Sequence, residues 1–263
     1  QRQMCIRDRV VVPMDVALTP QSAQTIEVSS AATLAVFDQE AYDTFGYSLK
    51  VRCTELHALA ESPKTTTFDT PTISPDKLAS ILYTSGTTGV PKGVMLSHKN
   101  FSSLLGSLAK IFPLTQKDRV LSVLPLHHTF EFSCGLLLPL SRGTRILYID
   151  EITGERLSYC LKEGKVTAMV GVPALWQLLE RRISSQVRDQ GKLFELLIDS
   201  AMDFNRSLGK STNIDLGKLL FAPIHAKLGG RIRYLISGGA ALPQETHKFF
   251  GGLGLHLTEG YGL

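Results

Sequence analysis

Tyr83-Thr84-Ser85-Gly86-Thr87-Thr88-Gly89-Val90-Pro91-Lys92-Gly93 is the stretch of this sequence that decides its fold. Five of its eleven residues carry hydroxyl groups, three are glycines and one is a lysine. It lies between two apolar runs, 78–82 and 94–96, that are each typical of a strand. Glycines let backbone N–H groups turn toward one centre, while hydroxyls and a lysine add donors and positive charge. The stretch therefore predicts a loop that cradles phosphate groups.

The spacing in this loop excludes two common phosphate-binding motifs. A Walker A loop needs a Gly-Lys pair followed by Ser or Thr, whereas Lys92 follows a proline and precedes a glycine. The GxGxxG fingerprint of dinucleotide-binding folds is also missing from the strand-to-helix turn. A flexible Ser/Thr/Gly linker is the simple alternative, and the apolar runs on both sides disfavour it.

Composition places the chain among ordinary globular proteins. Of its 263 residues, 43% are hydrophobic and 20% are charged. The formal charge of +4 does not suggest a nucleic-acid partner, and residues 1–9 contribute half of it. We expect residues 1–9, which are basic and without periodicity, to be a non-native or disordered end. No apolar run reaches the ~18 residues that span a bilayer. Four scattered cysteines are typical of reduced thiols in a cytoplasmic protein, and peripheral membrane association stays open.

Strand-like and helix-like patterns alternate along most of the chain. Thr19-Pro20 predicts a helix start, Ser97 a helix cap, and Pro173 another helix start. Helices are expected from Thr19-Pro20 to about residue 29, after Ser97, at 153–163 and at 173–179, and residues 181–230 read as helix alone. This alternation predicts an α/β fold with mainly parallel sheets covered by helices on both faces. The predicted strands are 10–14, 33–37, 49–53, 78–82, 93–96, 120–124, 144–149, 166–170, 231–236 and 253–257.

The second candidate site is Leu124-Pro125-Leu126-His127-His128-Thr129-Phe130-Glu131-Phe132, which follows a predicted strand. Two histidines near a glutamate are compatible with metal ligands, with acid–base groups or simply with the start of a helix. A zinc site needs a third and a fourth ligand at suitable spacing, and none of the other histidines supplies one nearby.

Two further glycine-containing stretches follow the last predicted strands. Ser237-Gly238-Gly239-Ala240-Ala241-Leu242-Pro243 contains small residues that allow a flat ring to approach the backbone. A tight strand-to-helix turn with Pro243 at the helix start is equally compatible with it. The other stretch is Glu259-Gly260-Tyr261-Gly262-Leu263.

Residues 83–93 resemble the signature phosphate loop of the adenylate-forming enzymes, which include acyl-CoA synthetases, luciferases and peptide-synthetase adenylation domains. The resemblance extends over residues 10–263. It implies that Lys92 and His128 are the catalytic residues, His128 lying beside the substrate carboxylate. It also places Thr84 at Mg²⁺ and Phe132 at the entrance of an acyl tunnel. The nucleotide-binding residues that it implies are Thr84, Ser85, Gly86, Thr87, Thr88, Gly89, Lys92, Ser237, Gly238, Gly239, Ala240, Tyr261 and Gly262.

Within that superfamily, the 124–132 motif and the segment 221–234 are similar to those of long-chain fatty-acid–CoA ligases. The implied reaction joins a fatty acid to coenzyme A with ATP and Mg²⁺ and releases AMP and pyrophosphate. Two alternatives are an acyl-AMP ligase that loads a carrier protein and a nucleotide- or acyl-binding module without turnover. We expect residues 10–263 to be a partial AMP-binding domain, without its start, its end and the family's C-terminal domain, and to be inactive alone.

Overall fold

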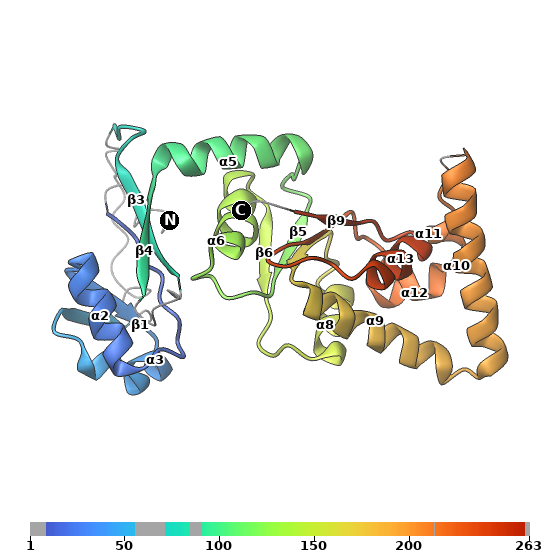
Figure 1. Ribbon diagram of the computed structural model, residues 1–263, viewed down its shortest axis with the longest axis horizontal. Coiled ribbons are helices and arrows are strands. Elements are labelled where there is room, and N and C mark those ends of the chain that lie inside the picture. Colours follow the sequence, from blue (N-terminus) through green and yellow to red (C-terminus); the bar gives the residue numbers. More distant parts are fainter. Residues whose placement is uncertain (1–8, 56–71, 85–90, 213, 261–263) are drawn as a thin grey trace. The chain divides into compact units, whose positions relative to one another are not determined.

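The computed structural model describes residues 9–55, 72–84, 91–212 and 214–260 (Figure 1). The chain forms two compact units. The first comprises residues 1–107 and 125–129, and the second comprises residues 108–124 and 130–263. The short segment 125–129 is therefore joined to the second unit at both of its ends.

The first unit begins with a small α/β layer. Thr19 caps α2 (Pro20–Ser30) by accepting a hydrogen bond from the Ser22 amide, as its sequence predicts. A parallel pair of strands, β1 (Leu34–Phe37) and β2 (Arg52–Glu55), follows. Between these strands lie α3 (Gln39–Thr44) and the 3₁₀ turn η1 (Gly46–Ser48). A buried cluster in this layer consists of Ala23, Phe37, Ala41 and Phe45.

The second part of the first unit is an antiparallel hairpin. Strand β3 (Leu78–Thr84) pairs with β4 (Lys92–Ser97), so the predicted phosphate loop connects two neighbouring strands. The prediction of a strand at 10–14 is wrong, because only Val11 pairs there, through a single parallel bridge to Ser80. Five residues with a proline among them form no ladder beyond one bridge here.

The second unit contains a five-stranded parallel sheet. Its strand order is β6-β5-β7-β8-β9, and all four pairings are parallel. This confirms the predicted α/β class. The last strand starts at Leu257, so the prediction of a strand at 253–257 is wrong for its first four residues. The strands are β5 (Arg119–Ser122), β6 (Arg145–Tyr148), β7 (Ala168–Gly171), β8 (Tyr234–Ser237) and β9 (Leu257–Glu259).

Helices cover both faces of this sheet. On one face Leu157, Trp176 and Phe250 pack with Leu121 and other strand residues in the main core. On the other face a smaller cluster contains Phe112, Cys134, Val170 and Ile236. The second-unit helices are α6 (Thr129–Glu131), which starts at the boundary, η2 (Phe132–Leu137), α7 (Leu138–Ser141), α8 (Gly154–Glu163), α9 (Pro173–Arg188), α10 (Lys192–Thr212), α11 (Gly217–Leu220), α12 (Ala222–Lys227) and α13 (Gln244–Gly252).

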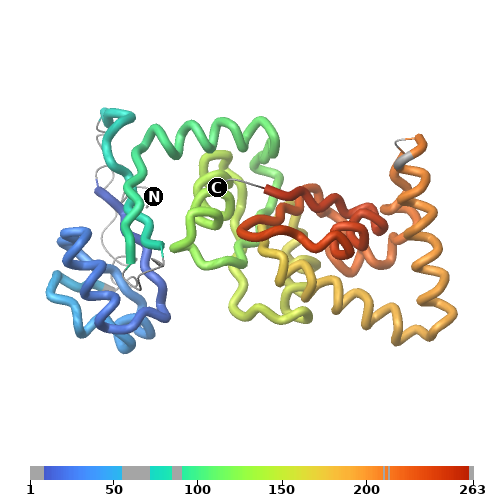
Figure 2. The backbone as a smooth tube through the Cα atoms, in the orientation of Figure 1, coloured from blue at the N-terminus to red at the C-terminus, as the bar shows by residue number. Residues whose placement is uncertain are grey.

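The helical stretch predicted at 181–230 is confirmed, and Figure 2 traces it from the end of α9 through α10 to α12. Helix α9 continues nine residues beyond the predicted end at residue 179. Helix α5 (His98–Ile111) starts after Ser97, whose hydroxyl accepts from the Asn100 amide. Among the residues described, no helix is long and apolar enough to cross a membrane.

Candidate functional site

The loop end of the β3–β4 hairpin presents two of the predicted phosphate-binding residues. Thr84 ends β3, Lys92 begins β4, and the two are direct partners in the strand register. The Thr84 hydroxyl donates to the backbone oxygen of Lys92 at 3.5 Å, and both side chains are exposed. A hydroxyl and an ammonium group thus emerge at one end of a rigid hairpin. Ser85, Gly86, Thr87, Thr88 and Gly89 lie outside the described residues.

Tyr83 secures this end of the hairpin. Its hydroxyl is 2.6 Å from Ser29 Oγ at the end of α2. Its ring lies over Gly93, the residue opposite it, where a Cβ would be 3.2 Å from Tyr83 Cζ and 2.8 Å from an Ile81 methyl carbon. Glycine at position 93 is therefore what allows the tyrosine ring to lie across the neighbouring strand.

The two histidines of the second motif stack on each other in the first unit. Their ring centroids are 4.1 Å apart, and the planes are tilted by 51°. His128 is exposed, whereas the side chain of His127 is largely buried. Asp15 Oδ2 lies 3.6 Å from His127 Nε2. Asp15, His127 and His128 thus lie in a row. The Asp15 carboxylate is behind the largely buried His127 ring, and the His128 ring in front of it is accessible.

The pKa of His127 is lowered. Burial of its ring is the largest cause, and repulsion from His128 adds to it, while the Asp15 carboxylate acts in the opposite direction. The neutral form of His127 is therefore favoured at neutral pH. A neutral ring packed behind His128 supports its position without carrying a positive charge itself.

The loop after β8 is fixed by its neighbours at the carboxyl edge of the parallel sheet. The Gly238 amide donates to the Gly171 oxygen at 3.0 Å, and the Gly260 amide donates to the Ser237 oxygen at 2.7 Å. The Glu259 carboxylate accepts from the Leu242 amide at 3.0 Å. Ser237 and Gly238 are buried, whereas Gly239, with a φ of 82°, and Ala240 are exposed. Tyr261 and Gly262 lie outside the described residues.

Phe130 connects the second motif with this loop. A Cβ at Gly238 would lie 2.8, 3.0 and 3.2 Å from three carbons of the Phe130 ring. Only a glycine at position 238 leaves room for the ring. This contact within the second unit brings together two stretches that are more than a hundred residues apart, and the sequence contains no signal for it.

Glu131, the next residue, is fully buried. The Ser122 hydroxyl at the end of β5 donates to its Oε1 at 2.5 Å, and Oε2 has no hydrogen-bond partner among the described residues. Burial raises the pKa of Glu131 to about 7, although Ser122 and the amides of Val123 and Leu124 favour its charged form. Burial, with a contribution from Glu131, also raises the pKa of the Cys134 thiol to about 12.

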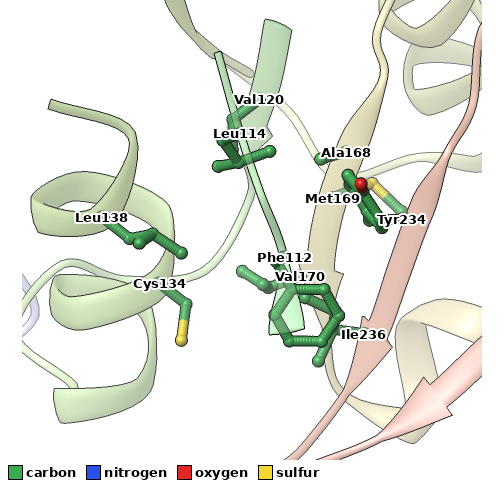
Figure 3. A pocket seen from close by; sticks show the side chains of 10 residues that line it. All are labelled: Phe112, Leu114, Val120, Cys134, Leu138, Ala168, Met169, Val170, Tyr234 and Ile236. Atoms are coloured by element: carbon green, nitrogen blue, oxygen red, sulfur yellow. The ribbon is translucent and has the colours of Figure 1, made fainter. Parts of the chain in front are cut away.

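An apolar cavity lies between the sheet and the helical segment that follows Glu131. Figure 3 shows Cys134 and Leu138 on the helical side and Ala168, Val170 and Ile236 among the side chains opposite them. The space available to the centre of a water-sized sphere is about 20 Å³, which is close to the size of one water molecule. Phe132 is buried at the start of the same segment.

The sequence model of the AMP-binding enzyme family matches residues 8–263. The chain belongs to this family. Among curated proteins, long-chain-fatty-acid–CoA ligase 1 of Schizosaccharomyces pombe is 33% identical over 201 residues, which are 72% of this chain and 29% of that protein. The human long-chain-fatty-acid–CoA ligase ACSBG2 is 35% identical over 206 residues, 72% of this chain and 30% of that protein. The chain thus spans about three tenths of these relatives.

Solved structures show the same fold for this AMP-binding chain. ATP-bound MatB from Rhodopseudomonas palustris matches with a TM-score of 0.71 and 22% identity, over 98% of this chain and 46% of that one. The N-terminal domain of FACL13 from Mycobacterium tuberculosis matches with a TM-score of 0.66 and 21% identity, over 97% of this chain and 56% of that one.

The donor set at the hairpin end fits a magnesium–nucleotide. Oxygen donors such as the Thr84 hydroxyl suit Mg²⁺, and the Lys92 ammonium group suits phosphate oxygens. Within the described ranges, no three His, Cys, Asp or Glu side chains are grouped so that they could hold a metal ion by themselves. A metal ion at Thr84 would therefore take most of its ligands from phosphate and water.

The sequence points to the loops of this AMP-binding chain, but it does not show which residues pack against them. Asp15 was not singled out, because nothing in residues 10–18 indicates that a residue more than a hundred positions away lies against it. The burial of Glu131 was also missed. Its position one turn before the small residue Gly135 is the only available signal, and it is weak.

Proposed function

We propose that the protein to which this chain belongs activates a long-chain fatty acid with ATP and transfers the acyl group to coenzyme A. The observation that carries the proposal is the hairpin that presents Thr84 and Lys92 at the two ends of a Ser/Thr/Gly loop. The names of four curated relatives, which are long-chain or palmitoyl ligases and synthetases of CoA, support the choice of acid and acceptor.

The proposed reaction has two halves. A carboxylate oxygen attacks the α-phosphorus of ATP, the bond to the β-phosphate breaks, and pyrophosphate leaves. The thiolate of coenzyme A then attacks the activated carbonyl carbon, and AMP leaves. Neither half needs a nucleophile from the protein, so catalysis consists of positioning and charge neutralisation.

The site residues divide between the two substrates. Lys92 and the loop 85–89 would hold the β- and γ-phosphates, and Thr84 would hold Mg²⁺, which supplies further positive charge there. Residues 237–240, with Tyr261 and Gly262, would form the wall against the adenine. The buried Ser237 and Gly238 backbone, tied to β7 and β9, gives this wall a fixed shape.

The carboxylate of the acid would lie beside His128. His128 is exposed and backed by the buried His127, which suits a group that orients a carboxylate. Phe132 would stand at the entrance of the acyl path. A cytoplasmic location, free or at a membrane surface, belongs to the same proposal.

ATP–pyrophosphate exchange by the protein expressed from its complete reading frame tests the first half-reaction. Palmitate should support exchange, and Lys92→Ala should reduce kcat/KM for ATP by about 10²- to 10³-fold, the usual effect of losing one charge-stabilising donor. Lys99→Ala is the matched control, because Lys99 lies on the surface beside Asp76. Absence of exchange with any fatty acid would disprove the proposal.

A second experiment separates the acceptors. Acyl-adenylate formed with palmitate should disappear on addition of coenzyme A and persist with a phosphopantetheinylated carrier protein. The opposite result would favour the carrier-loading ligase. The 263-residue chain alone should give negligible pyrophosphate release with palmitate. Robust release by it would contradict the proposal that residues 10–263 are a partial domain.

A further inference from the structure

The hairpin that presents Thr84 and Lys92 has only two strands in the part of the chain that the structure describes. Its one further pairing there is the single bridge between Val11 and Ser80. Ser80 is the third residue of β3, whereas Thr84 ends the strand, so this bridge does not hold the loop end. A two-stranded hairpin is marginally stable by itself. The position of Thr84 and Lys92 therefore depends on a support from outside the hairpin.

Tyr83 makes such a contact at the loop end. It precedes Thr84 and pairs with Gly93, the residue that follows Lys92. A Cβ at Gly93 would lie 3.2 and 3.4 Å from two carbons of the Tyr83 ring, so the ring lies directly over the neighbouring strand. The Tyr83 hydroxyl is 2.6 Å from Ser29 Oγ on α2. One side chain thus contacts both strands beside the site residues and reaches a helix outside the hairpin.

The direction of this hydrogen bond follows from the protons available. The Ser29 hydroxyl donates to the backbone oxygen of Thr25 in its own helix at 2.7 Å. A serine hydroxyl has one proton and two lone pairs. Because that proton is used within α2, the Tyr83 hydroxyl donates and Ser29 Oγ accepts. Removal of either hydroxyl therefore breaks the same bond.

Helix α2 is well anchored, which makes it a suitable point of attachment. Its Glu27 carboxylate accepts from the amides of Lys50 and Val51 at 2.8 and 2.7 Å. Ala23 on the same helix is fully buried. These contacts fix α2 to the small α/β layer of the first unit, so a hydrogen bond to α2 fixes the loop end of the hairpin to that layer as well.

We propose that Tyr83 and Ser29 are positioning residues whose hydrogen bond holds Thr84 and Lys92 in the arrangement that the phosphates of ATP require. A phenylalanine at position 83 would cover Gly93 equally well, so packing alone does not account for the hydroxyl. The inference rests on the proposed function, because it takes Thr84 and Lys92 as the groups that hold Mg²⁺ and phosphate. Tyr83 and Ser29 act through these two residues and do not contact the reacting atoms.

The expected effect is specific to ATP. Without the Tyr83–Ser29 hydrogen bond, the loop end of the hairpin moves more freely relative to α2, and Thr84 and Lys92 are less often in place for phosphate. The value of kcat/KM for ATP should fall by about 3- to 10-fold, the range expected for the loss of one hydrogen bond. Other residues hold the acid, His128 among them, so KM for palmitate should stay unchanged.

ATP–pyrophosphate exchange by the complete protein compares Tyr83→Phe, Ser29→Ala and the double variant. Each single variant should show the fall in kcat/KM for ATP, and the double variant should be no worse than either, because both changes remove one bond. Ser29→Thr keeps the acceptor oxygen and should restore most of the loss. Ser30→Ala is the matched control, since the Ser30 hydroxyl donates to the Glu27 backbone oxygen of its own helix at 3.3 Å.

Additive losses in the double variant, unchanged kcat/KM for ATP in both single variants, or equal rises of KM for ATP and palmitate would overturn the inference. Binding of a fluorescent ATP analogue without acid separates the inference from the proposed reaction. A protein that binds the analogue and loses affinity in Tyr83→Phe, yet gives no exchange with any acid, would contradict the proposed reaction and support the inference. A protein that binds no ATP analogue would contradict both.

Discussion

Gly238 and Phe130 form a close contact that supports the loop after β8. An alanine at position 238 would place its Cβ 2.8 Å from Phe130 Cζ, so the partly buried ring or the buried loop backbone would have to shift. We expect Gly238→Ala to lower the free energy of unfolding by about 1–3 kcal/mol, as for other overpacked sites. Urea unfolding measures it. Gly251→Ala serves as control, and an equally stable Gly238→Ala variant would show that the loop can move away from the ring.

His127 offers a prediction at the other motif. Asp15 raises the pKa of His127, while burial and His128 lower it by more. Asp15→Asn removes the raising contribution, so the pKa of His127 should fall further below its usual value. Titration of the histidine ring resonances by NMR measures this pKa directly. An unchanged or higher value would mean that the carboxylate does not act on the ring. Asp76→Asn, at an exposed carboxylate beside Lys99, is the matched control.

For single residues, the sequence indicates which side chains have useful chemical groups, but it does not indicate which residues those side chains contact. Lys92 and Thr84 stand out in the sequence because hydroxyls, glycines and a lysine in one short loop have few other uses, and their role at phosphate stays a prediction. The partners Asp15 of His127 and Phe130 of Gly238 could not be identified, because each pair is joined only by the folded chain. The burial of Glu131 contradicts the general tendency of glutamate to be exposed, and only its surroundings explain it.

At the scale of elements, helix starts were the most predictable features. Thr153 caps α8 by accepting from the Arg156 amide at 3.1 Å, and this helix buries Leu157 and Leu161 completely in the main core. The structure gives α8 as Gly154–Glu163, within one residue of the predicted range. Caps are local signals, since one hydroxyl and the next three residues contain the whole interaction.

The Thr153 cap can be tested by substitution. Thr153→Ala should lower the free energy of unfolding by about 1 kcal/mol, because it leaves an amide of the first turn without its acceptor. Thr153→Ser keeps the oxygen and should restore most of the loss. Urea denaturation followed by fluorescence of Trp176, the only tryptophan in the sequence and a fully buried core residue, measures the change. Equal stability of the alanine variant would show that water replaces the cap.

Strand pairing and helix type were less predictable than helix starts. Residues 10–14 have the composition of a strand but contribute one bridge, because pairing depends on the neighbour that the fold provides. The π-helical turn at Phe132–Leu137 has no sequence pattern of its own. It directly follows Glu131, whose carboxyl fills the space that a Cβ of residue 135 would occupy, and such a contact leaves no periodic pattern in the sequence.

For the whole molecule, pH-dependent stability combines groups that act in opposite directions. The lowered pKa of Asp118, which binds Arg233 and Thr115, stabilises the fold at neutral pH and loses this effect as acid protonates it. His127, with a lowered pKa, destabilises the fold as pH falls below its ordinary value near 6.5. Glu131 affects stability in the opposite direction. Its pKa is raised in the folded state, so it destabilises the fold as pH rises.

The contribution of Glu131 to stability should therefore decline as pH rises. Between its unfolded pKa of 4.5 and its folded pKa of about 7, the folded state binds the extra proton, so stability falls with increasing pH. At 1.36 kcal/mol for each unit, this group removes about 3 kcal/mol across that range. Glu131→Gln, which cannot ionise, should abolish the decline, and its stability relative to the wild type should rise from pH 5 to pH 8. Thermal unfolding monitored at Trp176, which lies in the same unit as Glu131, measures the difference.

Because Asp118 and His127 are common to both proteins, their contributions cancel in the comparison. Parallel pH curves for the two proteins would mean that the buried carboxyl ionises with an ordinary pKa.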